Sequence, residues 1–151
     1  MRVTTWAEYG LIVSLHLARR AGDGPVAARD MAEKEKLPAD YVEQILLRLR
    51  RAGLVDSVRG ARGGYLLARS PEDITVRDVV DASELGTFEV NCECHRVADT
   101  RCSSKTACSI RPVWQLLQRR IDETLGSIRL GDLFHEEAVV RDIIGLSTAA
   151  V

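Results

Sequence analysis

The 151-residue sequence predicts a mainly α-helical fold with a small β-hairpin, arranged as a winged helix-turn-helix followed by a long helix. Three observations predict this fold. Apolar residues recur at helical spacing through three segments up to Gly53. Two short strand-like runs then flank a glycine-rich turn, and helical spacing returns from Pro112 onward. This order of helices and hairpin is typical of a winged helix.

Three helices are predicted in the first part of the chain. They cover residues 5–20, 28–36 and 39–52. In the first, Thr5 and Glu8 have the spacing of a capping box, in which each side chain bonds to the other residue's backbone N–H. The second is expected to end before Pro38, because proline disfavours the helical conformation in the residue that precedes it. Gly53 is expected to end the third, since glycine readily adopts the left-handed conformation of a helix end.

The third predicted helix is amphipathic, and a hairpin follows it. Its apolar stripe consists of Val42, Ile45, Leu46 and Leu49. The residues after it, 54–58 and 65–68, are predicted to form two short strands. The glycines between these strands are Gly60, Gly63 and Gly64, and they supply the backbone freedom that a hairpin tip requires. We expect this hairpin to be the wing.

Helices are also predicted after the hairpin, with a segment of no clear periodicity between them. Thr75 is the expected N-cap of a helix that reaches Ser83. Further helices are expected at residues 112–128, 130–134 and 136–144. The chain accordingly divides into a winged helix-turn-helix (1–85), a cysteine-rich loop (86–110) and a C-terminal part with the long helix (111–151).

Composition and charge restrict the classes of function. No apolar run approaches the roughly 20 residues of a membrane span, and the N-terminus lacks a signal-peptide pattern, so we expect a cytoplasmic protein with no membrane partner. The formal net charge of −1 argues, taken alone, against a nucleic-acid partner. The total hides an asymmetry, because residues 1–70 carry 12 Lys and Arg against 8 Asp and Glu, whereas residues 71–151 carry 9 against 14.

Basic charge is concentrated in the third helix and the hairpin. From residue 48 to residue 69 there are six arginines and a single acid, Asp56. A solvated neutral surface would intersperse acids among these arginines. Side chains of a helix can reach base edges in the major groove, while arginines of a wing neutralise phosphates. Double-stranded DNA is therefore the expected partner.

All four cysteines lie within a 17-residue window, at Cys92, Cys94, Cys102 and Cys108. Cysteine thiolates bind soft metals and iron-sulfur clusters. The spacing fits a structural zinc site poorly, since such sites usually contain C-x2-4-C pairs. A metal-free thiol switch stays open as an alternative. A cysteine-based redox enzyme lacks support, because the chain has no C-x-x-C, no HExxH and no nucleophile with an obvious base.

Residues 41–68 closely resemble the recognition helix and wing of the Rrf-type winged-helix transcriptional regulators, which include IscR-like and NsrR-like iron-sulfur sensors. Their sequence is YVEQILLRLRRAGLVDSVRGARGGYLLA. The likeness extends to the opening MRVT, to ITVRDVV at residues 74–80, to a three-cysteine loop and to LGDL at residues 130–133. It implies a homodimeric, cytosolic bacterial transcription factor that binds a palindromic operator, with the long helix as its dimerisation element.

The resemblance implies which residues contact DNA. The family reads its operators with the start of the recognition helix and with a wing arginine, which correspond here to Tyr41, Glu43, Gln44 and Arg59. The chemistry agrees, because Gln44 can pair with adenine and Glu43 can accept a hydrogen bond from cytosine. The predicted phosphate contacts are Arg48, Arg50 and Arg62.

The resemblance also implies an iron-sulfur cluster, of the 4Fe-4S or 2Fe-2S type. The family's three cysteine ligands correspond to Cys94, Cys102 and Cys108. IscR-type members add a histidine three residues after the last cysteine, and this sequence has Arg111 there. The operator affinity is then expected to depend on a cluster that senses redox state, nitric oxide or iron-sulfur status.

The fourth ligand of such a cluster has several candidates. NsrR-like members draw a carboxylate from the first helix of the other subunit, and the matching residue is Glu8. A capping role for Glu8 is the alternative. Cys92 and His95 are the fallback ligands. The cysteine segment has a thiol switch and a zinc site as alternatives. A further alternative is that the DNA-binding protein responds to a small molecule or a partner protein.

Overall fold

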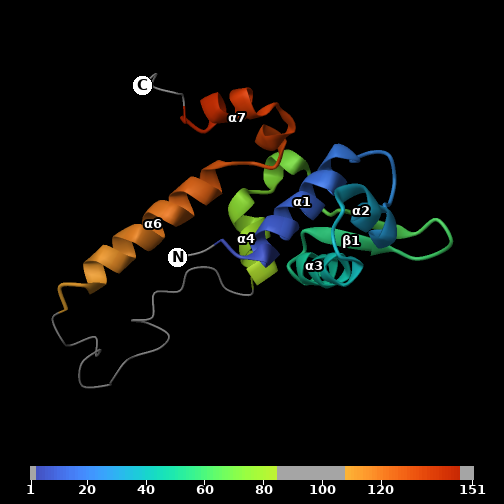
Figure 1. Cartoon of the computed structure of the whole chain (residues 1–151), viewed down its shortest axis with the longest axis horizontal. Helices are drawn as coiled ribbons and strands as arrows, with labels where there is room; N and C mark the ends of the chain where they lie inside the picture. Colours follow the sequence, from blue (N-terminus) through green and yellow to red (C-terminus); the bar gives the residue numbers. More distant parts are fainter. Residues whose placement is uncertain (1–2, 85–107, 147–151) are drawn as a thin grey trace.

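The structure is a computed structural model and describes residues 3–84 and 108–146. The described elements are α1 (Thr5–Arg19), α2 (Ala28–Glu35), α3 (Ala39–Arg51), β1 (Val55–Val58), β2 (Gly64–Leu67), the 3-10 turn η1 (Pro71–Asp73), α4 (Val76–Glu84), α6 (Arg111–Ser127), the 3-10 turn η2 (Gly131–Phe134) and α7 (Glu137–Ile143) (Figure 1). Apart from η1, which was not predicted, each lies within about two residues of its predicted range, and the mainly helical fold with a hairpin wing is confirmed.

The core lies between α1, α2, α3, the hairpin and α4. The predicted stripe of α3 is fully buried in it, at Val42, Ile45, Leu46 and Leu49. Burying each such side chain is worth about 1.5–3 kcal/mol. Gly53 ends α3 in the left-handed conformation, with φ of 71°, as its position predicts.

Helix α1 begins at Thr5, as predicted, but its N-cap is the residue before Thr5 and not Thr5 itself. Its N-cap is Thr4, whose Oγ1 accepts a 3.4 Å hydrogen bond from the backbone N–H of Ala7. The N–H of Glu8 bonds to the carbonyl oxygen of Thr4 at 3.1 Å. The capping box between Thr5 and Glu8 is therefore wrong, because the shift of one residue moves Glu8 out of the third helical position that a capping box requires. The Glu8 side chain is exposed.

The wing is a two-stranded antiparallel hairpin in which Val55 faces Leu67 and Val58 faces Gly64. Its second strand also exchanges two backbone hydrogen bonds with Val26, from Val26 N–H to the Tyr65 carbonyl (2.9 Å) and from Tyr65 N–H to the Val26 carbonyl (2.8 Å). A Cβ at position 64 would lie 2.4 Å from the Val26 carbonyl oxygen. Glycine is required there, because any side chain would push the strand off the body of the domain.

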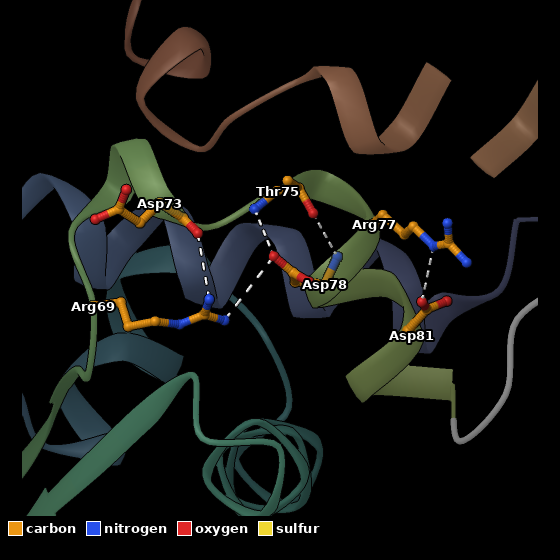
Figure 2. Close-up of polar contacts among 6 residues, drawn as sticks. All are labelled: Arg69, Asp73, Thr75, Arg77, Asp78 and Asp81. Carbon is orange, nitrogen blue, oxygen red and sulfur yellow. Dashed lines mark hydrogen bonds and ion pairs between the residues drawn. The ribbon is translucent and has the colours of Figure 1, made fainter. Parts of the chain in front are cut away.

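The end of the wing is fastened to the start of α4, as Figure 2 shows. Arg69 donates a hydrogen bond to the carbonyl of Asp73 at 3.4 Å and lies 4.0 Å from the carboxylate of Asp78. Thr75 and Asp78 cap α4 reciprocally, because each accepts from the other's backbone N–H at 3.0 and 2.9 Å. The predicted N-cap at Thr75 is confirmed, and Arg69 is directed toward α4.

One end of α6 is attached to this body. Arg77 on α4 lies 3.3 Å from Asp81 and 3.4 Å from Asp122 on α6. Burial raises the pKa of the Asp81 carboxyl, and the hydrogen bond from Arg77 opposes that effect. After α6, the N–H of Leu130 bonds to the Ile74 carbonyl at 2.9 Å, and the Leu130 side chain is fully buried in the main core.

The other end of α6 extends away from the winged helix (Figure 1). No residue of the helix is buried. Its apolar residues Val113, Trp114 and Leu116 have exposed fractions of 60, 47 and 54%. Single exposed apolar residues are normal, whereas several of them along one helix mark an interaction site. Among the described helices, none has the length and hydropathy to span a membrane.

Candidate nucleic-acid interface and cysteine segment

The exposed side of α3 carries the polar residues that the sequence assigned to DNA. Glu43 and Gln44 are exposed near its N-terminal end, and Arg50 and Arg51 are exposed near its C-terminal end. They lie opposite the fully buried stripe of the same helix, so nothing in the described part of the domain covers them. Arg51 is not among the predicted DNA contacts, although its position outside the apolar stripe of α3 indicates an exposed side chain.

Tyr41 is only partly directed outward. Its ring centroid lies 4.8 Å from that of Trp6 and 5.7 Å from that of Tyr9, both on α1. Tyr41 is 37% exposed, so part of its surface is accessible. Tyr41 therefore packs the start of α3 against α1, and the exposed part of its side chain is accessible to DNA.

Arg48 is directed into the domain. Its guanidinium carbon lies 3.8 Å from the ring centroid of Trp6, and its Nη1 donates a hydrogen bond to the backbone carbonyl of Ser83 at the end of α4. A cation stacked on an indole ring is stabilised by the negative charge of the ring face. In this conformation the guanidinium of Arg48, a predicted phosphate contact, binds α1 and α4 instead.

The tip of the wing carries two exposed arginines, Arg59 and Arg62. Gly60 between them has φ of 118°, the left-handed region that glycine adopts without strain. Arg50 donates a 3.3 Å hydrogen bond to the Ser57 hydroxyl and so links the end of α3 to β1. The exposed arginines of α3 and the wing are Arg50, Arg51, Arg59 and Arg62.

The predicted cluster ligands fall on both sides of the described boundary. Cys92, Cys94, His95 and Cys102 lie outside the described residues. Cys108 lies just before α6 and is partly exposed, and Glu8 is exposed on α1. Within residues 3–84 and 108–146, no three His, Cys, Asp or Glu side chains gather to hold a metal ion. The donor set itself is of the type that iron-sulfur clusters use, because it consists mainly of thiolates.

A winged helix with exposed arginines on its third helix and its wing defines the class of winged helix-turn-helix DNA-binding proteins. Residues 3–136 match the model of the Rrf2 family, described as iron-dependent transcriptional regulators. The chain belongs to this family. Its relatives are transcriptional regulators and not enzymes, so the predicted class of function is confirmed in outline.

Several named relatives agree with this assignment. The transcriptional regulator IscR of Photobacterium profundum is 37% identical over 139 residues, which are 92% of this chain and 78% of IscR. The solved structure of T. potens IscR is 34% identical, with a TM-score of 0.70 over 100% of this chain and 94% of that one. CymR, the global cysteine regulator of B. subtilis, is 32% identical, with a TM-score of 0.71 over 88% of this chain and 95% of that one.

Proposed function

We propose that the chain is a homodimeric transcription regulator whose affinity for a palindromic operator is controlled by an iron-sulfur cluster. The observation that carries this proposal is the place of the cysteines. All four lie between α4, which packs in the DNA-binding body, and α6, which presents an exposed apolar surface. A ligand held there is connected to both elements through the chain. The family's description as iron-dependent supports iron as that ligand.

The proposed DNA contacts are the outward residues of α3 and the wing. Gln44 and Glu43 suit base edges, since an amide pairs bidentately with adenine and a carboxylate accepts from cytosine. The exposed arginines suit phosphates, which position the protein on the duplex without reading sequence. Tyr41 is 37% exposed near the start of α3 and is retained as a DNA contact. Arg48 is left out of this set, because its guanidinium contacts the Trp6 ring and the Ser83 carbonyl inside the domain.

The homodimer is proposed to form through α6. The exposed apolar residues of this helix include Val113, Trp114 and Leu116, and Ile110 at its N-cap is exposed as well. A second copy offers the same residues, so a two-fold axis would bury both sets in one self-complementary interface. Two recognition helices related by such an axis read two inverted half-sites, which is why a palindromic operator belongs to the proposal.

The proposed cluster ligands are Cys94, Cys102 and Cys108, with Glu8 of the other subunit as the fourth and Cys92 or His95 in reserve. The exposed Glu8 carboxylate supports its place in this set, because the cap of α1 does not use it. When bound, a cluster supplies a metal centre whose charge and coordination respond to oxidants and nitric oxide. Its control of DNA binding requires different affinities for the DNA-competent and DNA-incompetent conformations.

The wing assignment predicts a salt-sensitive effect of Arg59→Ala. Removing one phosphate contact should weaken operator binding and reduce the slope of log affinity against log salt by about one. Fluorescence anisotropy with a duplex selected from random sequences, titrated at several salt concentrations, measures both quantities. Arg141→Ala is the matched control, because Arg141 is exposed on α7 and pairs with Glu137 at 2.7 Å. Equal affinity and slope for Arg59→Ala and the unaltered protein would contradict a DNA contact by the wing.

A further inference from the structure

Trp6 is held between two residues of the recognition helix. Tyr41 and Arg48 are seven residues apart on α3, so they lie two turns apart on one side of it. The centroid of the Trp6 ring lies 4.8 Å from that of Tyr41 and 3.8 Å from the guanidinium carbon of Arg48. A shift of α1 along α3 would therefore break one of these two contacts.

Arg48 also binds the far end of α4. Its Nη1 donates to the carbonyl of Ser83, one of the last carbonyls of the helix, which have no partner within it. Ser83 is fully buried against Gly10 of α1, where an added Cβ would lie 2.9 Å from the Ser83 Cβ. The Thr4 hydroxyl donates to the Glu84 carboxylate in the same corner. The guanidinium of Arg48 thus joins three helices at one point.

Both attachments of Arg48 are on helices that connect in sequence to residues that the proposed function assigns to the cluster. Trp6 precedes Glu8 by two residues on α1. Ser83 lies one residue before the end of α4, after which the chain continues to Cys92 and Cys94. Among the described side chains of α3, Arg48 alone combines a ring contact with α1 and a hydrogen bond to the last turn of α4.

We propose that Arg48 is a positioning residue that couples the ligand state of the cysteine segment to the orientation of the recognition helix. The inference rests on the proposed function and names the residue through which it acts. A displacement of α1 at Glu8, or of the end of α4, changes the geometry around the guanidinium, and α3 must tilt to keep both contacts. Such coupling has an effect only if the two ligand states favour different tilts.

The test compares operator affinities of cluster-loaded and cluster-free protein for the unaltered chain, Arg48→Met and Arg50→Met. Methionine keeps most of the side-chain volume and removes the charge. Allosteric couplings typically change affinity by about 5- to 150-fold, and we expect a ratio in this range for the unaltered protein. For Arg48→Met the ratio should fall to within about twofold of one, with cluster absorbance retained. Arg50→Met, on the same helix, should weaken both states equally and leave the ratio unchanged.

A second measurement checks the contact itself. The chain has two tryptophans, so Trp114→Phe leaves Trp6 as the sole indole fluorophore. In cluster-free protein with this background, Arg48→Met should shift the Trp6 emission and Arg50→Met should not. An unshifted emission would overturn the contact on which the proposal rests. Thermal unfolding of each variant shows whether it is folded.

The outcomes distinguish a failure of the coupling through Arg48 from a failure of the proposed control by a cluster. Unaltered protein whose affinity is the same with and without cluster would contradict the proposed function and the coupling together. The coupling alone would be overturned if the affinity ratio between cluster-loaded and cluster-free protein lay in the expected range for the unaltered chain and stayed the same in Arg48→Met. Loss of DNA binding in both states of Arg48→Met, with normal unfolding, would assign Arg48 to DNA contact and would also overturn it.

Discussion

Replacing Cys108 with alanine is expected to abolish cluster binding. Cys108 is one of three proposed thiolate ligands, and a cluster that loses one of them loses a strong bond that water cannot replace. After anaerobic reconstitution, the unaltered protein should show visible absorbance with stoichiometric iron and sulfide. Cys108→Ala should show neither, and its operator affinity should equal that of the cluster-free protein. Absorbance spectra, iron and sulfide assays and operator titration measure these effects.

Cys92→Ala is the matched control for this ligand set. Cys92 lies in the same segment but outside the three proposed positions, so this variant should reconstitute like the unaltered chain. Full iron and sulfide content in Cys108→Ala would contradict the assignment, and loss in Cys92→Ala would move Cys92 into the ligand set. Zinc without sulfide, or a colourless protein whose thiols oxidise reversibly, would instead support the zinc site or the thiol switch.

Introducing a charge on the exposed surface of α6 is expected to separate the subunits. Leu116 is 54% exposed, so Leu116→Asp leaves the core of the single chain intact. In a dimer through α6 it would place two unpaired carboxylates in an apolar interface, which is strongly unfavourable. We expect a monomer by analytical ultracentrifugation. Operator affinity should fall by about 100-fold or more, because the second half-site no longer binds from the same complex.

The control for this variant is Gln115→Ala, which changes an exposed polar residue of the same helix. It should remain dimeric, and both variants should keep the helical circular dichroism of the unaltered chain. Leu116→Asp that sediments as the unaltered dimer would contradict an interface through α6. A monomeric variant that binds the palindromic operator as tightly as the unaltered protein would contradict the need for two subunits on DNA.

Most of the fold followed from local patterns in the sequence. The α3 stripe at Val42, Ile45 and Leu49 predicts its buried side, and Gly53 predicts its end, because both depend on residues adjacent in the helix. The sequence predicts Thr5 as the N-cap of α1, whereas the N-cap is Thr4. Both threonines are competent N-caps, and only the backbone conformation distinguishes them.

The roles of individual arginines could not be predicted in the same way. Arg48 and Arg69 belong to the basic stretch that points to DNA, yet their partners are Trp6 and Ser83 for the first and Asp73 and Asp78 for the second. These partners are distant in sequence or on other elements, so helical spacing carries no signal of them. Composition locates a basic surface, while tertiary packing decides which cations reach it.

The same distinction holds for the cysteine segment. Residue type and spacing identify thiolate donors, because ligand chemistry depends on the side chains themselves. The geometry of a site that joins two subunits depends on their assembly, which a single chain does not determine. The exposed Glu8 and the partly exposed Cys108 are the described ligand candidates on which that assembly can be tested.

The central claim, that a cluster controls operator affinity, is tested most directly by one titration. A single preparation is divided, one half is loaded with cluster anaerobically, and both halves are titrated into the same palindromic duplex at the same salt concentration. If a cluster controls operator affinity, the two dissociation constants differ by about fivefold or more. Equal dissociation constants, in a preparation whose iron and sulfide contents confirm loading, would contradict it.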